Sequence, residues 1–314
     1  MKSFDILAIG DLNIDLILGL ESLPQFGREV LAHSLAQHAG GVAANFATYC
    51  VRLGLKVALV ARVGHDSYGD FLIEHMRQTG VCTDYIIRDD TLATGLTVSL
   101  SGPADRAFVT HLGTIDSLTG ADVPDALLAQ TRFVHVGSYF MQSKLQPDLP
   151  DLLQRAHAAG ALTSLDTGYD PYERWNTSLP QALPHLDLFL PNEIEATSIA
   201  NNPDALSAGR ALAAQTGAVA LKLGGKGSWL LTTEDEIFAP PFAVEVADTT
   251  CCGDSFDAGF VAAWLKGKTP QERLLWGNAC GALVASGPGN YAENVSVEGI
   301  EEVISTGRAT PLTH

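Results

Sequence analysis

The chain has 314 residues, of which 46% are hydrophobic and 18% are charged, and its formal net charge is −17. This composition supports a buried core and excludes a disordered chain. The basic residues are scattered, which excludes the dense cationic face that nucleic-acid binding requires. An anionic ligand would therefore need local help from metal ions, backbone amides or a few well-placed lysines.

Targeting and redox signals are weak. The N-terminus has neither the apolar core nor the cleavage site of a signal peptide, and no apolar run approaches the roughly 20 residues that span a bilayer. The five cysteines match neither a disulfide framework nor a zinc-ligand pattern, being irregularly spaced at Cys50, Cys82, Cys251, Cys252 and Cys280. We expect a protein of the reducing cytoplasm that does not contact the membrane.

Apolar runs alternate along the chain with segments of helical period, which is typical of a mostly parallel sheet covered by helices. The runs predict strands at residues 6–9, 57–63, 133–136, 162–166, 186–190 and 219–223. The helical period predicts helices at residues 42–53, 68–79, 149–159, 192–200, 254–265 and 270–285. Because no sharp boundary interrupts this alternation, we expect one domain over residues 1–314.

Two regions depart from the alternation. Residues 16–35 are extended and rich in turn formers, without helical period. Residues 95–100 and 107–112 predict two strands joined by a turn-rich connection at 101–105. Extended segments that cannot join a parallel core would form a small separate sheet. We expect this sheet, from approximately residues 16–35 and 95–112, to act as a lid over one end of the core.

The most informative stretch runs from Asp248 to Gly259 and carries small residues before a predicted helix that starts at Asp254. Small residues there expose free N–H groups, which together with the helix dipole make an anion site. Asp254 would repel a phosphate at such a site, but it could serve as a base for a substrate hydroxyl. Asp is also common as a helix N-cap, and the local sequence favours neither interpretation.

Two further segments could contact a ligand. Gly40-Gly41 precedes a helix of small residues that places Asn45 just over one turn inside, although such a glycine pair is usually only a turn. After the first strand, Asp11, Asn13 and Asp15 occupy alternate positions and therefore share one face. That face is either a solvated strand end or part of a binding site.

Together these segments resemble the ribokinase-like (PfkB) carbohydrate kinase family over almost the whole chain. Residues 248–254 are similar to its D-T-x-[GA]-A-G-D motif, and the glycine pair with Asn45 is similar to its N-terminal motif. Asn192 and Glu195 match its N-x-x-E motif, and residues 222–227 lie where the family has a glycine turn. The resemblance implies a ribokinase-like three-layer αβα sandwich with a mostly parallel central sheet and a small β-sheet lid.

The resemblance also implies an activity, namely ATP-dependent phosphorylation of a hydroxyl group on a sugar or sugar-like small molecule. Asp254 would be the catalytic base, beside an anion hole made by the amides of Cys251, Cys252 and Gly253. The substrate would be held by Asn13, Asp15, Gly41 and Asn45, and the nucleotide by Asn192, Lys222, Gly224, Gly227 and Asn278. Glu195 would bind Mg²⁺ through water, and a monovalent-cation site for K⁺ would lie near Asp248 and Thr250, with Gly287 and Gly289 beside them.

Several residues depart from the family pattern. Cys251 and Cys252 replace its small residues, either as inert substitutes or as thiols of lowered pKa that are open to oxidation. Ala43 stands where ribokinases carry a lysine, which weakens ribose as the substrate. Asp166 follows a predicted strand at the edge where ligands gather, which suggests a phosphate or metal role. For Asp254 we expect an ordinary pKa of about 3.9.

Alternative functions remain open at this point. The same scaffold could serve a nucleoside kinase or a non-catalytic sugar- or nucleotide-binding regulator. A sugar phosphate would need a basic cluster, for which the candidates near the lid are Arg28, His33, His38, Arg106 and His111. Exposed strand edges in the lid also lead us to expect a homodimer.

Overall fold

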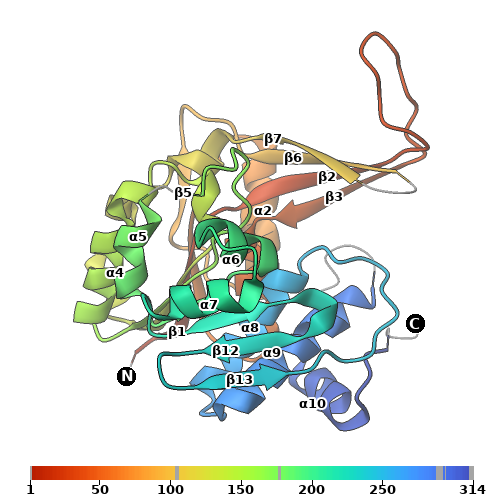
Figure 1. Ribbon diagram of the computed structural model, residues 1–314. Coiled ribbons are helices and arrows are strands. Elements are labelled where there is room, and N and C mark those ends of the chain that lie inside the picture. Colours follow the sequence, from red (N-terminus) through yellow and green to blue (C-terminus); the bar gives the residue numbers. More distant parts are fainter. Residues whose placement is uncertain (1, 103–105, 176–177, 288–292, 294, 311–314) are drawn as a thin grey trace.

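The computed structural model describes residues 2–102, 106–175, 178–287, 293 and 295–310. Within these residues, nine strands form the main sheet (Figure 1). Their order is β13 (Glu236–Ala239), β12 (Ser228–Leu231), β11 (Val219–Lys222), β10 (Leu188–Phe189), β9 (Leu162–Leu165), β8 (Thr131–Val136), β1 (Phe4–Ile9), β4 (Val57–Gly64) and β5 (Ile86–Asp89). Neighbours from β11 to β5 are parallel, and β12 and β13 are added antiparallel.

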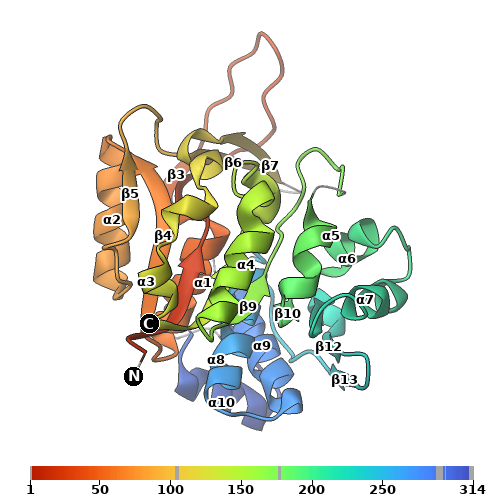
Figure 2. The same cartoon turned by 90° about the vertical axis from the view of Figure 1, so that its left-hand side faces the viewer.

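Helices cover both faces of this sheet, as Figures 1 and 2 show from two directions. One face packs against α1 (Val42–Arg52), α2 (Ser67–Thr79), α8 (Cys252–Leu265), α9 (Pro270–Ala285) and α10 (Val297–Thr306). The other packs against α3 (Asp125–Leu128), α4 (Leu149–Ala158), α5 (Leu179–Ala182), α6 (Glu193–Ile199) and α7 (Ala205–Ala213). Strand side chains alternate between the two cores, because Ile6 and Ala8 of β1 belong to the first and Leu7 and Ile9 to the second. The predicted three-layer αβα sandwich is confirmed.

Short 3-10 helices lie in the connections at η1 (Gly113–Ser117), η2 (Gly120–Asp122), η3 (Tyr139–Met141), η4 (Gln146–Asp148), η5 (Leu183–His185) and η6 (Gly224–Lys226). Within the ranges that the structure describes, no helix combines the length and the apolar character needed to cross a membrane.

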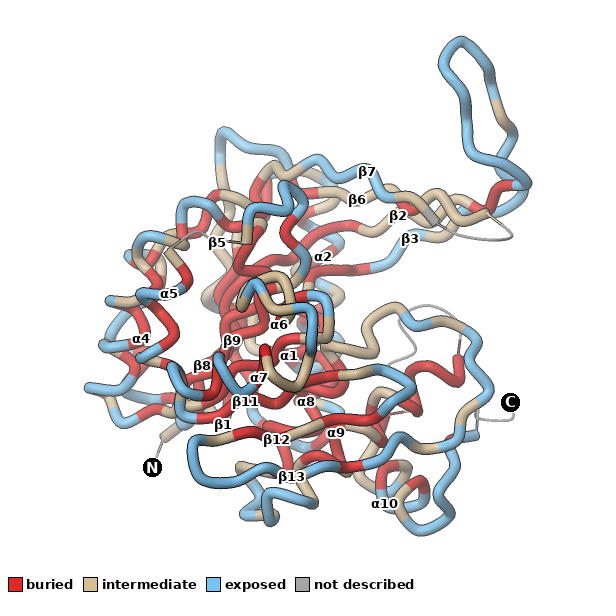
Figure 3. The backbone as a smooth tube through the Cα atoms, viewed as in Figure 1, coloured by how far each residue is buried: buried red, intermediate tan, exposed pale blue. Residues whose placement is uncertain are grey.

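A second, smaller sheet projects from one end of the core (Figure 1). Its order is β3 (Ser34–Gly40), β2 (Asn13–Gly19), β6 (Leu96–Ser101) and β7 (Arg106–His111), with β2 and β6 parallel and the other pairs antiparallel. Its strands are buried where they join the core, and the loop of residues 20–33 extends beyond it into solvent (Figure 3). The predicted pairing of two strands around residues 101–105 is present, although Pro103, Ala104 and Asp105 lie outside the described residues.

Some boundaries differ from the sequence prediction. The extended segment predicted at residues 16–35 contains parts of two strands, β2 and β3, which reach back to Asn13 and forward to Gly40. Helix α8 begins at Cys252, two residues before the predicted start at Asp254. Strands β5, β12 and β13, at the two edges of the main sheet, were not predicted.

Candidate active site

The N-terminus of α8 has an unusual backbone conformation. Cys251 is its N-cap, with φ 61° and ψ 8° in the left-handed region, and its side chain makes no capping hydrogen bond. Asp254 is the third helical residue, so the interpretation of Asp254 as an N-cap is wrong. The Cys252 amide donates to Thr249 O at 3.3 Å. The first amides of any helix lack carbonyl partners within that helix, so the amides of α8 that follow Cys252 are directed at whatever lies before the helix.

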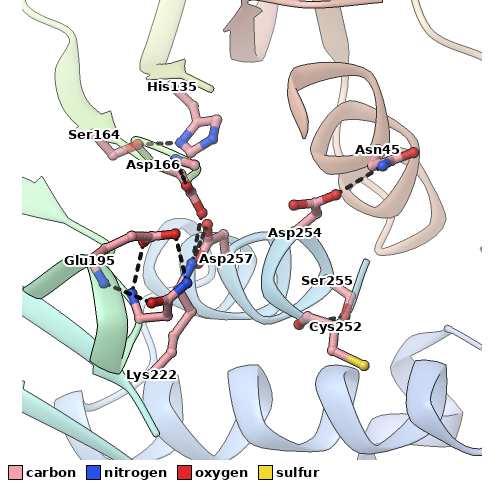
Figure 4. Close-up of polar contacts among 12 residues, drawn as sticks. Asn45, His135, Ser164, Asp166, Glu195, Lys222, Cys252, Asp254, Ser255 and Asp257 are labelled. Carbon is pink, nitrogen blue, oxygen red and sulfur yellow. Dashed lines mark hydrogen bonds and ion pairs between the residues drawn. The ribbon is translucent and has the colours of Figure 1, made fainter. Parts of the chain in front are cut away.

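Asp254 faces α1 rather than its own helix end (Figure 4). Asn45 Nδ2 donates to Asp254 Oδ2 at 2.8 Å and lies 3.2 Å from Cys251 Sγ. Burial, followed by the charge of Asp166, raises the pKa of Asp254 to about 8, against the opposing effects of Asn45 and Lys222. The ordinary pKa expected from sequence is therefore wrong. A carboxyl group with this pKa can gain and lose a proton near neutral pH, which is what a general base requires.

The glycine pair allows a close approach between α1 and the start of the small sheet. Gly41 is the N-cap of α1 with φ 108°, and a Cβ there would lie 2.5 Å from Asp11 O. A Cβ at Gly40 would lie 2.1 Å from Asp15 Oδ2. Asn13 Nδ2 donates to Asp15 Oδ1 at 2.8 Å, and burial raises the pKa of Asp15 to about 6. The pair is thus more than a turn, since it lets the Asp11 backbone and the Asp15 side chain come close to the start of α1.

A cavity of about 400 Å³ opens at the carboxyl ends of β9 and β11. One end contains Gly253 and Asp254, together with Asp166 and Glu195. Lys222 is the only lysine, arginine or histidine among the described residues that line it. The cavity wall is therefore acidic, and an anionic ligand there requires a further source of positive charge.

The other end of the cavity is largely apolar. Its walls come from the segment before α8 and from α8 and α9, at Pro241, Phe242, Val244, Val246, Phe256, Ala282 and Ala285. Asn278 lines the same end and donates from Nδ2 to Ala239 O at 3.2 Å and to Pro240 O at 3.0 Å. An apolar slot with a single amide group suits a flat, weakly polar ring.

A tight glycine turn borders the cavity between β11 and β12. Gly224 and Gly227 have φ of 55° and 95°, and a Cβ at Gly227 would lie 2.3 Å from Ala239 O. The Leu223 amide closes the turn by donating to Gly227 O at 2.9 Å. Lys226 points elsewhere and pairs with Glu193 at 2.8 Å. The turn therefore presents backbone, not this lysine, to a ligand.

Asn192 and Glu195 close the N-terminus of α6 with a reciprocal capping box. Asn192 Oδ1 accepts from the Glu195 amide at 2.9 Å, and the Glu195 carboxylate accepts from the Asn192 amide at 2.9 Å and from Asn192 Nδ2 at 2.6 Å. Both residues line the cavity. Burial and the charge of Asp166 raise the pKa of Glu195 to about 7. A nearby cation would stabilise the ionised form of a carboxyl group in this position.

Lys222 is held by two carboxylates, one of which sequence reasoning missed. Its Nζ lies 2.7 Å from Asp166 Oδ2 and 3.0 Å from Asp257 Oδ1. Although burial opposes it, the charges of Asp166 and Asp257 raise the pKa of Lys222 well above its usual value. Asp257 follows Asp254 by three residues on α8. Its one sequence signal is an acidic residue within an otherwise small and apolar helical run.

The remaining predicted residues have simpler surroundings. Thr250 donates from its amide and its hydroxyl to Asp248 Oδ1, at 2.8 Å and 2.7 Å. Gly289 lies outside the described residues. Within the described ranges, no cluster of three or more His, Cys, Asp or Glu side chains is arranged to hold a metal ion. Burial and the nearby Asp254 charge raise the pKa of the Cys251 thiol, so the hypothesis of a lowered pKa is wrong for Cys251.

Comparison with known proteins places this site in a family. The model described as pfkB family carbohydrate kinase matches residues 3–296. The chain belongs to this family. A fructoselysine 6-kinase from Shigella flexneri is 31% identical over 249 residues, 78% of this chain and 88% of that protein. A ribokinase from Bacillus subtilis is 27% identical over 303 residues, 96% of this chain and 99% of that protein.

A solved structure agrees with this assignment at the level of the fold. An E. coli protein provisionally assigned as a ribokinase II, in complex with ATP and Mg²⁺, superposes with a TM-score of 0.85. The match covers 96% of this chain and 99% of that chain at 21% sequence identity. The predicted ribokinase-like fold is confirmed, and the chain is a carbohydrate kinase of the pfkB family.

Proposed function

We propose that this pfkB-family kinase transfers the γ-phosphoryl group of ATP to a hydroxyl group of a free sugar or sugar-like molecule, with Asp254 as the general base. The observation that carries the proposal is the Asp254 carboxylate, which lies beside the open start of α8, meets Asn45 at 2.8 Å and has its pKa raised to about 8. Relatives named for sugar substrates, the ribokinase and the fructoselysine 6-kinase, support a sugar as acceptor.

The cavity suits ATP in one orientation. The adenine ring fits the apolar end beside Asn278, and the phosphates then extend past Gly224 and Gly227 toward the start of α8. Lys222 and Asn192 line this path. ATP and Mg²⁺ are both bound in the E. coli structural neighbour, which supports the same pair here.

The residues present fit Mg²⁺, a hard cation that prefers oxygen ligands and keeps several waters. Both Glu195 oxygens already accept hydrogen bonds from Asn192, so Glu195 would reach the ion through water. Bound Mg²⁺ supplies positive charge to the phosphates in a cavity that is otherwise acidic. For the monovalent cation, Asp248 and Thr250 offer the oxygen atoms of a K⁺ site. The test is the phosphorylation rate in K⁺ against an equal concentration of the tetramethylammonium ion.

In this proposal the attacking hydroxyl of the sugar lies beside Asn45 and Asp254, and the other hydroxyls of the sugar contact Asn13, Asp15 and Gly41. Asp254 orients the attacking hydroxyl and takes its proton as the new P–O bond forms. Backbone amides of Cys251, Cys252 and Gly253 then stabilise charge on the equatorial oxygens. Because phosphoryl transfer has a loose transition state, such positioning and charge neutralisation provide most of the catalysis.

The decisive experiment measures ADP release with Mg²⁺ over a panel of sugars, sugar derivatives and nucleosides, for the wild type and for Asp254→Asn. We expect a sugar to be phosphorylated by the wild type and not by the variant. Phosphorylation of a nucleoside instead would show that the acceptor is a nucleoside and that the protein is a nucleoside kinase. Saturable ligand binding without turnover by the wild type would identify a non-catalytic regulator and overturn the proposal.

The small sheet is also the proposed dimer surface. By strand register, Leu18, Leu35 and Leu100 share one face with Val98 and Val109. Leu35 and Val109 are 69% and 61% exposed. A second copy would cover these apolar side chains and the outer edges of β3 and β7. Light scattering at micromolar concentration should give a dimer, and Leu35→Lys with Val109→Lys should give a monomer.

A further inference from the structure

A row of polar side chains crosses the sheet beneath α8 (Figure 4). His135 of β8 pairs in register with Ser164 of β9, and His135 Nδ1 lies 2.8 Å from Ser164 Oγ. Asp166, two residues further along, falls on the same face, and it reaches Lys222 at the end of β11. Asp257 meets the row from α8 above. Other positions on this face are apolar, as at Ile6, Ala8, Phe133 and Ala220.

The centre of the row is an ionic cluster of three side chains. Lys222 Nζ donates to Asp166 Oδ2 at 2.7 Å and to the two Asp257 oxygens at 3.0 Å and 3.1 Å. The three side chains are 9%, 6% and 0% exposed for Lys222, Asp166 and Asp257. A Cβ built on Gly253 would lie 3.7 Å from Lys222 Nζ. The ammonium group therefore sits directly below the backbone of the proposed anion hole.

Stability alone does not account for this cluster. Removing charges from water costs several kcal/mol per ion, and buried ion pairs are often replaced by apolar residues without loss of stability. The face around the cluster is apolar, so apolar side chains could fill the same space. The cluster joins β9, β11 and the second turn of α8 at the one point where a transferred phosphoryl group would lie. This position favours a role in the reaction.

We propose that Asp166 and Asp257 are positioning residues that hold the Lys222 ammonium group beneath Gly253, at the floor of the anion hole. The inference rests on the proposed phosphoryl transfer and deepens it. The two carboxylates, which come from the end of β9 and from α8, fix one direction for the flexible lysine side chain. They also keep Lys222 away from Asp254, with which a free ammonium group would form an ion pair that occupies the base. Asp166 thereby acts as the counter-ion of Lys222, in place of the phosphate or metal role suggested by its position in the sequence.

The test compares Asp257→Ala, Asp257→Asn and Asp166→Asn with the wild type on the sugar that the panel identifies. We expect Asp257→Ala to lower kcat by roughly 10- to 100-fold while the KM for the sugar changes less than about threefold, because the anion hole and not the sugar site is affected. Asp257→Asn should recover most of the loss, since its amide oxygen still accepts from Lys222 and burial already raises the pKa of Asp257 well above its usual value. Asp166→Asn should lower kcat by about tenfold, because the nearest negative charge is lost.

Asp170→Asn is the matched control. Asp170 is also a buried carboxylate just after β9, but it accepts from the backbone amides of Tyr172, Arg174 and Trp175 at 2.9, 2.7 and 2.8 Å. Its replacement should lower the melting temperature and leave kcat unchanged. A binding measurement gives a second readout, which does not depend on the stability of the fold. Adding aluminium fluoride to ADP, Mg²⁺ and the sugar should tighten ADP binding in the wild type and much less in Asp257→Ala.

The outcomes separate this inference from the proposed function. If the wild type phosphorylates a sugar, Asp254→Asn does not, and the Asp166 and Asp257 variants keep wild-type kcat and aluminium fluoride binding, then the positioning role is overturned alone. Loss of melting temperature without loss of kcat in those variants leads to the same conclusion. If Asp257→Ala does not fold, Asp166→Asn decides, and a wild-type kcat in that variant overturns the positioning role. A wild type without kinase activity would instead overturn the proposed function itself.

Discussion

Helices α6 and α8 begin at the same edge of the sheet, and each carries an acidic residue at its third position. In α6 this residue is Glu195, which reaches back to the Asn192 amide and completes a capping box. In α8 it is Asp254, which turns to Asn45 on another helix, and the side chain of the N-cap Cys251 makes no capping hydrogen bond. One helix end is closed by its own sequence, and the other remains open to a ligand.

The difference shows how equivalent positions acquire different chemistry. A capping box requires a Glu or Gln at the third position together with a capping side chain, and α6 has both. In α8 the acidic side chain is one methylene shorter, and a left-handed Cys251 stands where a Ser, Thr or Asn would cap. Burial raises the pKa of both carboxyls, to about 7 for Glu195 and about 8 for Asp254. We infer that Glu195 shapes the site and that Asp254 reacts.

The largest expected effect is on Asp254. Asp254→Asn removes the base and should lower kcat by about 10²- to 10⁴-fold. Thermal stability should not fall, because the variant removes a carboxylate whose burial disfavours its ionised form. A coupled ADP-release assay and a thermal melt measure the two quantities. Asp204→Asn, at the N-cap of α7, is the control and should leave both nearly unchanged, since Asn is an equally good cap. A near-normal kcat in Asp254→Asn would show that Asp254 is not the general base.

Glu195→Ala should affect folding more than chemistry. Opening the capping box should lower the free energy of unfolding by about 1 kcal/mol, measured by urea denaturation. The kcat should fall less than about tenfold at saturating Mg²⁺, while the Mg²⁺ concentration for half-maximal rate rises. Glu195→Gln, which preserves the shape of the cap, should recover most of the stability. A loss of kcat as large as that of Asp254→Asn would mean that the two acidic positions are not used differently.

A smaller effect is expected on the pH dependence of kcat/KM. Asp254 must be ionised to accept a proton, so the rate should fall as the pH drops through about 8. Asn45 donates to the ionised carboxylate and lowers its pKa, so Asn45→Ala should move the midpoint upward, by less than about one pH unit. Thr48→Ala, which removes a hydroxyl that donates to Ala44 O within α1, is the control and should leave the midpoint in place. A downward shift in Asn45→Ala would contradict the assignment.

Much of this site could be predicted from the sequence, because its main signals are local. The glycine pair with Asn45, the Asn192–Glu195 spacing and the small residues before Asp254 each leave a pattern within a few residues of chain. The long apolar runs and helical periods similarly indicate the core strands and the longer helices. Strands β12 and β13 were not predicted, because the antiparallel edge that they form depends on pairing with β11 and not on a local pattern.

The rest depends on tertiary contacts. Asp257 looks like an isolated acid in a buried helix until β11 brings Lys222 beneath it. The left-handed Cys251 could not be predicted, because non-glycine residues rarely adopt positive φ without support from their surroundings. The pKa of Asp254 is set by burial and by Asp166, which is distant in sequence. Charge and burial at the site are therefore properties of the assembled layers and not of any single motif.

The smallest expected effect concerns the thiol at the open end of α8. A helix N-terminus lowers the pKa of a neighbouring thiol, whereas burial and a nearby negative charge raise it. At Cys251 burial and Asp254 prevail, so thiolate is scarce at neutral pH. Low-millimolar peroxide should therefore leave kcat unchanged over an hour, with Cys251→Ser behaving identically. Inactivation that ATP prevents and a thiol reverses would show instead that the positive end of α8 outweighs the charge of Asp254, and the open helix end would then be a redox-sensitive one.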